Sequence, residues 1–93
     1  MLSLHQIFDS YLVPHFEEFI ADQKETCHTR FQIGENTKEE EQNKCKDRCS
    51  TNTECNYYFF SNDKIGWCAL YSACHIRRST FMSGSIFKKR GIS

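Results

Sequence analysis

The chain has 93 residues, a formal net charge of +0 at pH 7, 39% hydrophobic residues and 14% aromatic residues. A domain of this length buries too little apolar surface for a large core, so it needs additional stabilisation, such as covalent cross-links. The balanced charge leaves no basic excess to neutralise phosphates, and no apolar run has the length of a membrane span. We therefore expect that the chain does not bind nucleic acid and has no membrane-spanning segment.

The first segment, residues 1–26, contains no cysteine and is rich in apolar side chains. Phe16, Phe19 and Ile20 recur at the spacing of one helix face, with acidic residues between them. This pattern predicts a short amphipathic helix. We expect residues 1–26 to form an N-terminal helical extension of the domain formed by residues 27–93.

A strand and a helix are expected next. The alternation in TRFQIG, residues 29–34, predicts a first strand, and Thr37 opens a capping box that predicts a helix over about residues 38–50. Cys45 and Cys49 are four residues apart, so both sulfurs lie on one side of that helix. The other residues of the helix are charged or polar, so its docking must come from the sulfurs.

Aromatic segments indicate the remaining strands. The pattern predicts antiparallel strands over residues 56–60 and 66–71 with the loop SNDKI between them, a connecting loop over 72–84, and a last strand over 85–89. If Cys68 and Leu70 point to the helix, strand alternation turns Trp67 and Tyr71 to the opposite face.

Six cysteines in a short chain are typical of a disulfide framework in an oxidising compartment. Six cysteines allow 15 pairings, so spacing alone does not select one. Zinc is disfavoured because structural zinc sites show two tight ligand pairs, whereas this chain has one. We expect no metal, no cofactor and no catalytic activity. The cysteines are Cys27, Cys45, Cys49, Cys55, Cys68 and Cys74.

A helix that presents Cys45 and Cys49 can send one bond to Cys68 and the other to Cys55. The order of motifs along residues 27–90 also resembles the PAN/apple domain family. The resemblance rests on Cys45-x3-Cys49-x5-Cys55, on Tyr58 and Phe60, on WCAL with Cys68 and Leu70, and on SGSIFKK. It implies an α+β fold, a small disulfide-rich antiparallel sheet cradling one helix, with the bonds Cys45–Cys68 and Cys49–Cys55.

The third bond departs from the family pattern. Apple domains with a third bond join a cysteine of the first strand to one just after the last strand, where this chain has Arg90. Cys27 and Cys74 are the two cysteines left over, and we expect them to pair with each other.

The resemblance implies a non-catalytic binding or adhesion module, extracellular or at the cell surface, whose ligand is a protein or a glycan. A second hypothesis is a structural or assembly subunit of a larger complex or filament, held through residues 1–26. MLSLHQIFDSYLVPHF lacks the pattern of a signal peptide. Either Met1 is not the start of the translated product, or the chain reaches another oxidising compartment, such as the mitochondrial intermembrane space.

Two groups of residues are the candidate ligand site. Short basic runs supply Arg77, Arg78, Lys88 and Lys89, which suit an anion or a sulfated glycan. The resemblance implies that Tyr58 and Phe60 face the helix, which places Tyr57 and Phe59 with Trp67 and Tyr71 on the other sheet face. Four aromatics there form a patch that a soluble monomer does not normally leave uncovered. We expect the apolar residues of 1–26, from this chain or from a neighbouring copy, to cover that face.

Overall fold

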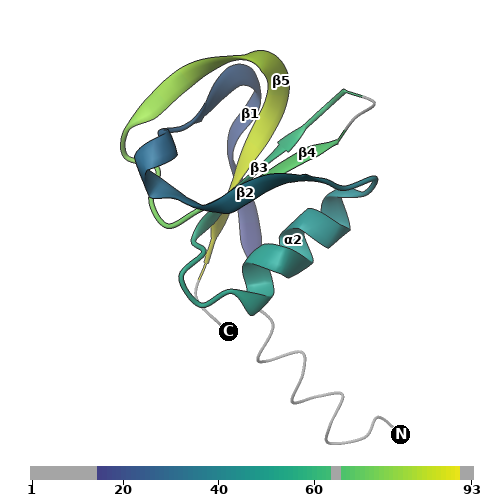
Figure 1. Cartoon of the computed structure of the whole chain (residues 1–93), viewed down its shortest axis with the longest axis vertical. Helices are drawn as coiled ribbons and strands as arrows, with labels where there is room; N and C mark the ends of the chain where they lie inside the picture. The colour runs from purple at the N-terminus through teal and green to yellow at the C-terminus, as the bar shows by residue number, and fades with distance from the viewer. Residues whose placement is uncertain (1–14, 64–65, 91–93) are drawn as a thin grey trace, which may run out of the picture.

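An antiparallel sheet dominates the computed structural model, which describes residues 15–63 and 66–90 (Figure 1). Within these residues the sheet has five strands in the order β1-β5-β3-β4-β2, and every neighbouring pair is antiparallel. One short α-helix and one 3-10 turn complete the described part. The elements are β1 (Phe16–Cys27), η1 (Thr29–Phe31), β2 (Gln32–Lys38), α2 (Gln42–Thr51), β3 (Tyr57–Ser61), β4 (Trp67–Tyr71) and β5 (Arg77–Lys89).

The expected N-terminal helical extension is wrong, because Phe16–Cys27 is strand β1 and pairs with β5. The part of the expected helix that precedes His15 lies outside the described residues. Along β1, Glu18 pairs with Phe87 and Ile20 pairs with Ile86, so one extra residue is inserted on the β1 side. Such a β-bulge reverses which face the following side chains occupy.

This bulge explains why the sequence pattern suggested a helix. Phe16 contacts Tyr58 on one face of the sheet, with ring centroids 5.1 Å apart. On the face opposite to Phe16, Phe19 contacts Tyr57 and Ile20 packs against the core. The helix-like spacing therefore belongs to a bulged strand that places apolar side chains on both faces of the sheet. The fold is a mostly antiparallel sheet with one short helix.

Strand β5 is longer than expected, and its pairing with β1 has a larger irregularity. It begins at Arg77, inside the segment expected to be a connecting loop. Gln23 pairs with Gly84, but Glu25 pairs with Ser79, so residues 80–83 are excluded from the pairing. Residues 84–88 of β5 pair with β3, and the rest of the β1–β5 pair curls away from the β3–β4 hairpin (Figure 1).

Helix α2 begins four residues later than predicted. Thr37 and Lys38 belong to β2, where they pair with Cys68 and Trp67, so Thr37 is not a helix cap. The N-cap is Glu41, which makes no side-chain capping bond. The expected strand over 29–34 is likewise displaced, since residues 29–31 form η1 and β2 starts afterwards.

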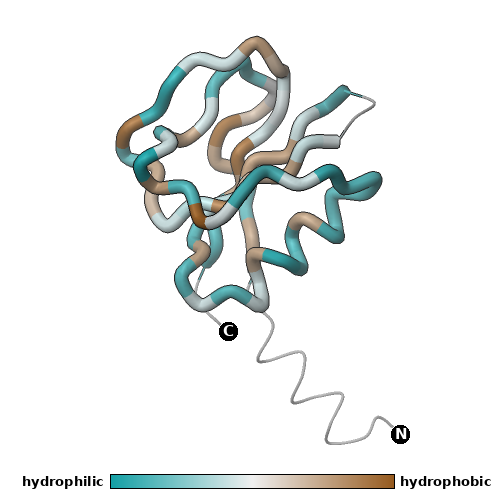
Figure 2. Tube along the Cα trace, in the orientation of Figure 1, coloured by the Kyte–Doolittle hydropathy of each residue, from teal (hydrophilic) through white to brown (hydrophobic). Residues whose placement is uncertain are grey.

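The helix has no apolar stripe, and its only buried residues are Cys45 and Cys49. Figure 2 shows α2 almost entirely in hydrophilic colours, while the hydrophobic colours gather on the strands. The two cysteines bond to Cys68 on β4 and to Cys55 before β3, with Cα–Cα distances of 5.6 and 5.2 Å. The helix is thus attached to the sheet through sulfur, as the sequence predicts.

The third disulfide joins Cys27 at the end of β1 to Cys74, with a Cα–Cα distance of 4.8 Å. All three pairs are those that the sequence analysis expects, and all six cysteines are buried. The bond ties the end of β1 to the segment between β4 and β5. Three disulfides in a chain of this size fit an oxidising compartment.

The central strands alternate between two small cores. Tyr58, Leu70 and the two helix disulfides form one core on the helix side. Phe59, Tyr71 and the Cys27–Cys74 bond form the other, which confirms the predicted alternation. The second core is covered by the described chain itself rather than by a helix. Its partly buried neighbours are Ile20, Phe31, Tyr57 and Met82, from β1, η1, β3 and β5.

Candidate functional site

The aromatic residues expected to bind a ligand are largely core residues. Phe59 and Tyr71 are each 2% exposed. The Tyr71 hydroxyl is hydrogen-bonded to Thr26 Oγ1 at 2.9 Å, and burial raises the pKa of Tyr71. Tyr57 is half-buried beside Phe19. Trp67 lines a surface hollow.

The basic residues proposed as an anion site are not brought together. Arg77 and Arg78 lie at the first residues of β5, whereas Lys88 and Lys89 lie at its end. A strand rises about 3.3 Å per residue, so even with the bulge the two pairs occupy opposite ends of the molecule's longest strand. Arg77 is also ion-paired with Glu25 at 3.1 Å. The two runs therefore form no common anion site.

Lys89 has a structural role instead. Its Nζ donates hydrogen bonds to the carbonyl oxygens of Cys49 at 2.7 Å and Asn52 at 3.1 Å. These are carbonyls at the C-terminal end of α2, where a positive charge offsets the helix dipole. Partial burial lowers the pKa of Lys89. The residue fixes the end of the helix and is not free to bind a ligand.

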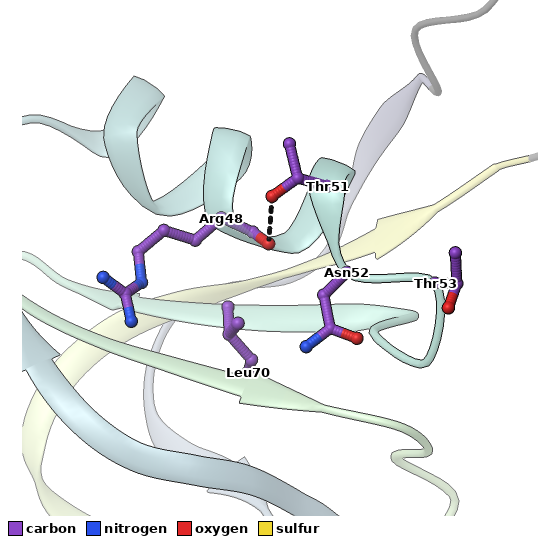
Figure 3. Close-up of a pocket in the computed structure, with 5 residues that line it drawn as sticks. All are labelled: Arg48, Thr51, Asn52, Thr53 and Leu70. Carbon is purple, nitrogen blue, oxygen red and sulfur yellow. Dashed lines mark hydrogen bonds between the residues drawn. The ribbon is translucent and has the colours of Figure 1, made fainter.

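Next to this helix end lies an open hollow of ≈ 470 Å³, lined by Arg48, Thr51, Asn52, Thr53 and Leu70. We call it the helix-end hollow. Figure 3 shows the Leu70 side chain rising between the guanidinium of Arg48 and the amide of Asn52. Three of the five lining residues come from the segment between Cys49 and Cys55, which the short disulfide closes into a loop.

The loop backbone is held by local hydrogen bonds as well as by the disulfide. The side-chain Oδ1 of Asn52 accepts from the N–H of Glu54 at 2.9 Å, and the carbonyl of Asn52 accepts from the N–H of Cys55 at 3.0 Å. Thr51 Oγ1 donates to the carbonyl of Arg48 at 3.2 Å, drawn as a dashed line in Figure 3. The loop that lines the hollow is therefore held in one conformation by these bonds.

Arg48 carries the positive charge of the hollow. Its Nη1 contacts Glu39 Oε1 at 3.4 Å, a long separation for a charged pair. The Arg48 side chain is 46% exposed and the Glu39 side chain 18%. A surface ion pair of this kind contributes little free energy, so the guanidinium can exchange this partner for another anion.

A second hollow of ≈ 400 Å³, the Trp67 hollow, is lined by Asn62, Asp63, Trp67, Phe81, Met82 and Ser83. Phe81 is 91% exposed, the most exposed large hydrophobic side chain in the described residues. The ammonium of Lys38 lies 5.5 Å from the centre of the Trp67 ring. This hollow is mainly apolar, and Phe81 projects from the bulged part of β5.

Sequence reasoning missed Arg48, Asn52 and Phe81. Phe81 was placed in a connecting loop, where an exposed aromatic has no evident structural meaning. Arg48 and Asn52 stood among many polar residues of a hydrophilic helix. The available signal was the expected Cys49–Cys55 bond, because it encloses a short run made only of polar residues.

The described residues contain no group of three or more His, Cys, Asp or Glu side chains that could hold a metal ion. All six cysteines are in disulfides, so the chain offers no thiolate nucleophile in this form. In residues 15–63 and 66–90, no helix has the length and apolar character required to cross a membrane. No protein-family model matches the chain, and neither a curated protein nor a solved structure matches it.

Proposed function

We propose that this chain is an extracellular, non-catalytic binding module that recognises a protein or a glycan through the helix-end hollow. The observation that carries the proposal is a preformed loop with unused donors. Asn52 Oδ1 is taken by Glu54, which leaves Nδ2 without a partner among the described residues, and Arg48 has only its long contact to Glu39. Polar groups that remain available to a ligand beside an apolar residue are the normal composition of a recognition site.

The disulfides support the compartment in this proposal. A small domain held by three disulfides is typical of secreted and cell-surface proteins. The pairs Cys45–Cys68 and Cys49–Cys55 are also those that the resemblance to PAN/apple domains implies. We therefore propose a relationship to that family, whose members bind proteins or glycans.

The test is an array of glycans and extracellular protein domains probed with the labelled full chain. The informative variant combines Arg48→Gln with Asn52→Ala, and the matched control is Arg30→Gln, which removes a charge from an exposed residue of η1 that lines neither hollow. We expect a ligand whose signal is lost in the double variant and kept in the control. A ligand bound equally by all three proteins would place recognition elsewhere, and no ligand at all would refute the binding function.

Assembly is the second candidate function, and the exposure of Phe81 favours it. An aromatic side chain that is 91% exposed next to Trp67 is suited to a contact between proteins. Assembly through the sheet edges is disfavoured, since β1 and β2 both show register shifts, which protect edge strands from pairing. The expected contact through residues 1–26 is not available as a free helix, because Phe16–Cys27 already pairs with β5.

Sedimentation equilibrium of the full chain separates the two functions. In the assembly hypothesis the chain forms oligomers that Phe81→Ser dissociates, while Ile76→Ser, at a side chain 39% exposed outside both hollows, leaves them intact. Oligomers insensitive to Phe81→Ser would exclude this surface. A monomer at all concentrations would leave the binding module as the remaining candidate.

A further inference from the structure

The polar groups of the helix-end hollow are arranged around one apolar side chain. In Figure 3 the guanidinium of Arg48 and the amide of Asn52 lie on either side of Leu70, and the hydroxyl-bearing Thr51 and Thr53 lie nearer to the Asn52 side. The orientation of the Asn52 amide is fixed by its bond from Glu54, so Nδ2 is the atom left to donate. A bound group thus meets a cation at one end and an amide donor at the other.

We propose that the helix-end hollow binds a sugar residue that bears a carboxylate, an inference that rests on the proposed binding function and names its ligand class. The planar guanidinium of Arg48 pairs with a carboxylate through two parallel hydrogen bonds. Asn52 Nδ2 can donate, the Thr53 hydroxyl can donate and accept, and Thr51 Oγ1, whose proton goes to a backbone carbonyl, can accept, which suits the hydroxyls of a sugar ring. Leu70, only 9% exposed, packs against the apolar face of that ring.

The position of the hollow favours a sugar over an extended peptide. An extended peptide gains affinity mainly by adding its backbone to an open strand edge. Leu70 belongs to β4, which is paired with β3 on one side and with β2 on the other. The floor of the hollow therefore has no open edge, and recognition depends on side chains. A volume of ≈ 470 Å³ lies within the range of small-molecule sites.

The helix end is normally unfavourable for an anion because its carbonyl groups carry partial negative charge. Here the ammonium of Lys89 binds the carbonyls of Cys49 and Asn52 and offsets that charge. Glu39 is the remaining negative group in contact with Arg48. It competes with the ligand carboxylate for the guanidinium, so removing its charge strengthens binding.

The experiment is an NMR titration of the 93-residue, disulfide-bonded chain. The probes are the methyl glycosides of N-acetylneuraminic acid and of glucuronic acid, with methyl glucoside as the neutral sugar and N-acetylaspartate amide as the carboxylate without a sugar. We expect backbone shifts over Arg48 and residues 51–53 with one of the two acidic sugars, and weaker or no shifts with the other probes. Which acidic sugar binds distinguishes a sialic-acid source from a uronic-acid source.

Three variants make the expectation quantitative. Arg48→Gln weakens binding of the acidic sugar by at least about tenfold, the loss of a charge-assisted pair. Glu39→Gln tightens binding severalfold, an effect that a purely structural role of Glu39 would not produce. The control Arg30→Gln, with the same change in net charge as Arg48→Gln, leaves the affinity unchanged, and the spectra of the free proteins show that each variant is folded.

Several outcomes overturn the proposal. Equal binding of the neutral sugar removes the role of the carboxylate, and preferential binding of N-acetylaspartate amide removes the sugar. Absence of binding by all four probes also refutes the ligand class. In each case the array result decides separately whether the hollow binds another ligand, so failure of the inference and failure of the proposed function are distinguishable.

Discussion

Replacing both Cys45 and Cys68 by alanine tests how the helix is held. The bond closes a loop with a sequence separation of 23, which the chain-entropy model values at about 3.4 kcal/mol of unfolding free energy. Helix α2 has ten residues and buries only its cysteines. Isolated helices of this length are marginal in water, so the helix should lose its structure locally when this bond is removed.

The control is the double alanine variant of Cys27 and Cys74. That bond has a sequence separation of 47 and a model value of about 4 kcal/mol, but it touches neither α2 nor the helix-side core. Urea unfolding followed by Trp67 fluorescence gives the loss of stability in each variant. Hydrogen exchange resolves where it occurs, and we expect lost protection across Gln42–Thr51 only in the Cys45/Cys68 variant.

One result would refute this account of docking. If the amides of Gln42–Thr51 keep their protection without the Cys45–Cys68 bond, other contacts hold the helix. The candidates are the remaining Cys49–Cys55 bond and the Lys89 ammonium at the end of the helix, and the hydrogen bond from Gln42 Nε2 to the Tyr58 hydroxyl, at 3.2 Å, at its start. Equal loss of protection in the helix and the sheet would show instead a single cooperative unit.

Three further changes have defined outcomes. Gly84→Ala should cost about 2 to 3 kcal/mol in urea unfolding, because a Cβ there would lie 2.5 Å from the Phe59 ring, and an unchanged midpoint would contradict this packing. Burial raises the pKa of Tyr58 and Tyr71 above the ordinary value, so the folded state favours the neutral phenols. The contribution of the two neutral phenols to the free energy of unfolding is complete below about pH 10 and is lost as the pH rises through their raised pKa values. Normal titration of every tyrosine, followed by absorbance at 295 nm, would contradict this prediction. Lys89→Met should cost about 1 to 3 kcal/mol and raise hydrogen exchange in the last turn of α2, whereas unchanged exchange there would mean that the helix end needs no cation.

The parts of the fold that could be predicted depend on short-range patterns. Cys45 and Cys49 are one turn apart on a polar helix, so sulfur docking follows from the helix period alone. The opposite faces of Tyr58 and Phe59 follow from strand alternation once one residue is assigned. These features require no knowledge of which distant strands pair.

The features that were missed arise from pairing between distant segments. The bulge at Phe19 and the excluded residues 80–83 lie in the β1–β5 pair, where Ile20 and Met82 pack against the second core. Nothing local in the sequence marks either irregularity. The ligand site was misplaced for the same reason, because Lys88 and Lys89 are clustered in the sequence but Lys89 is used by the helix end. Arg48 becomes a candidate ligand-binding residue only because it lines the same hollow as Leu70.

A last prediction distinguishes two models for residues 15–22: part of strand β1, or a separate helical extension. Two truncated chains, lacking residues 1–14 and 1–22, differ only in residues 15–22. A separate helix over these residues would leave the sheet intact when removed. In the structure their loss takes away Phe16 from Tyr58 and Phe19 from Tyr57, together with the core contact of Ile20.

Three partly buried apolar side chains at about 1 kcal/mol each give a loss of about 3 kcal/mol, before the lost pairing with β5 is counted. Urea unfolding of the two truncated chains should therefore show a clearly lower midpoint for the shorter one. Hydrogen exchange should increase along residues 86–89 of β5, which lose their pairing with residues 16–20 of β1 and keep only β3 as a neighbour. Equal midpoints, with unchanged exchange in β5, would mean that residues 15–22 do not belong to the sheet, and the bulged-strand explanation of their helix-like spacing would be wrong.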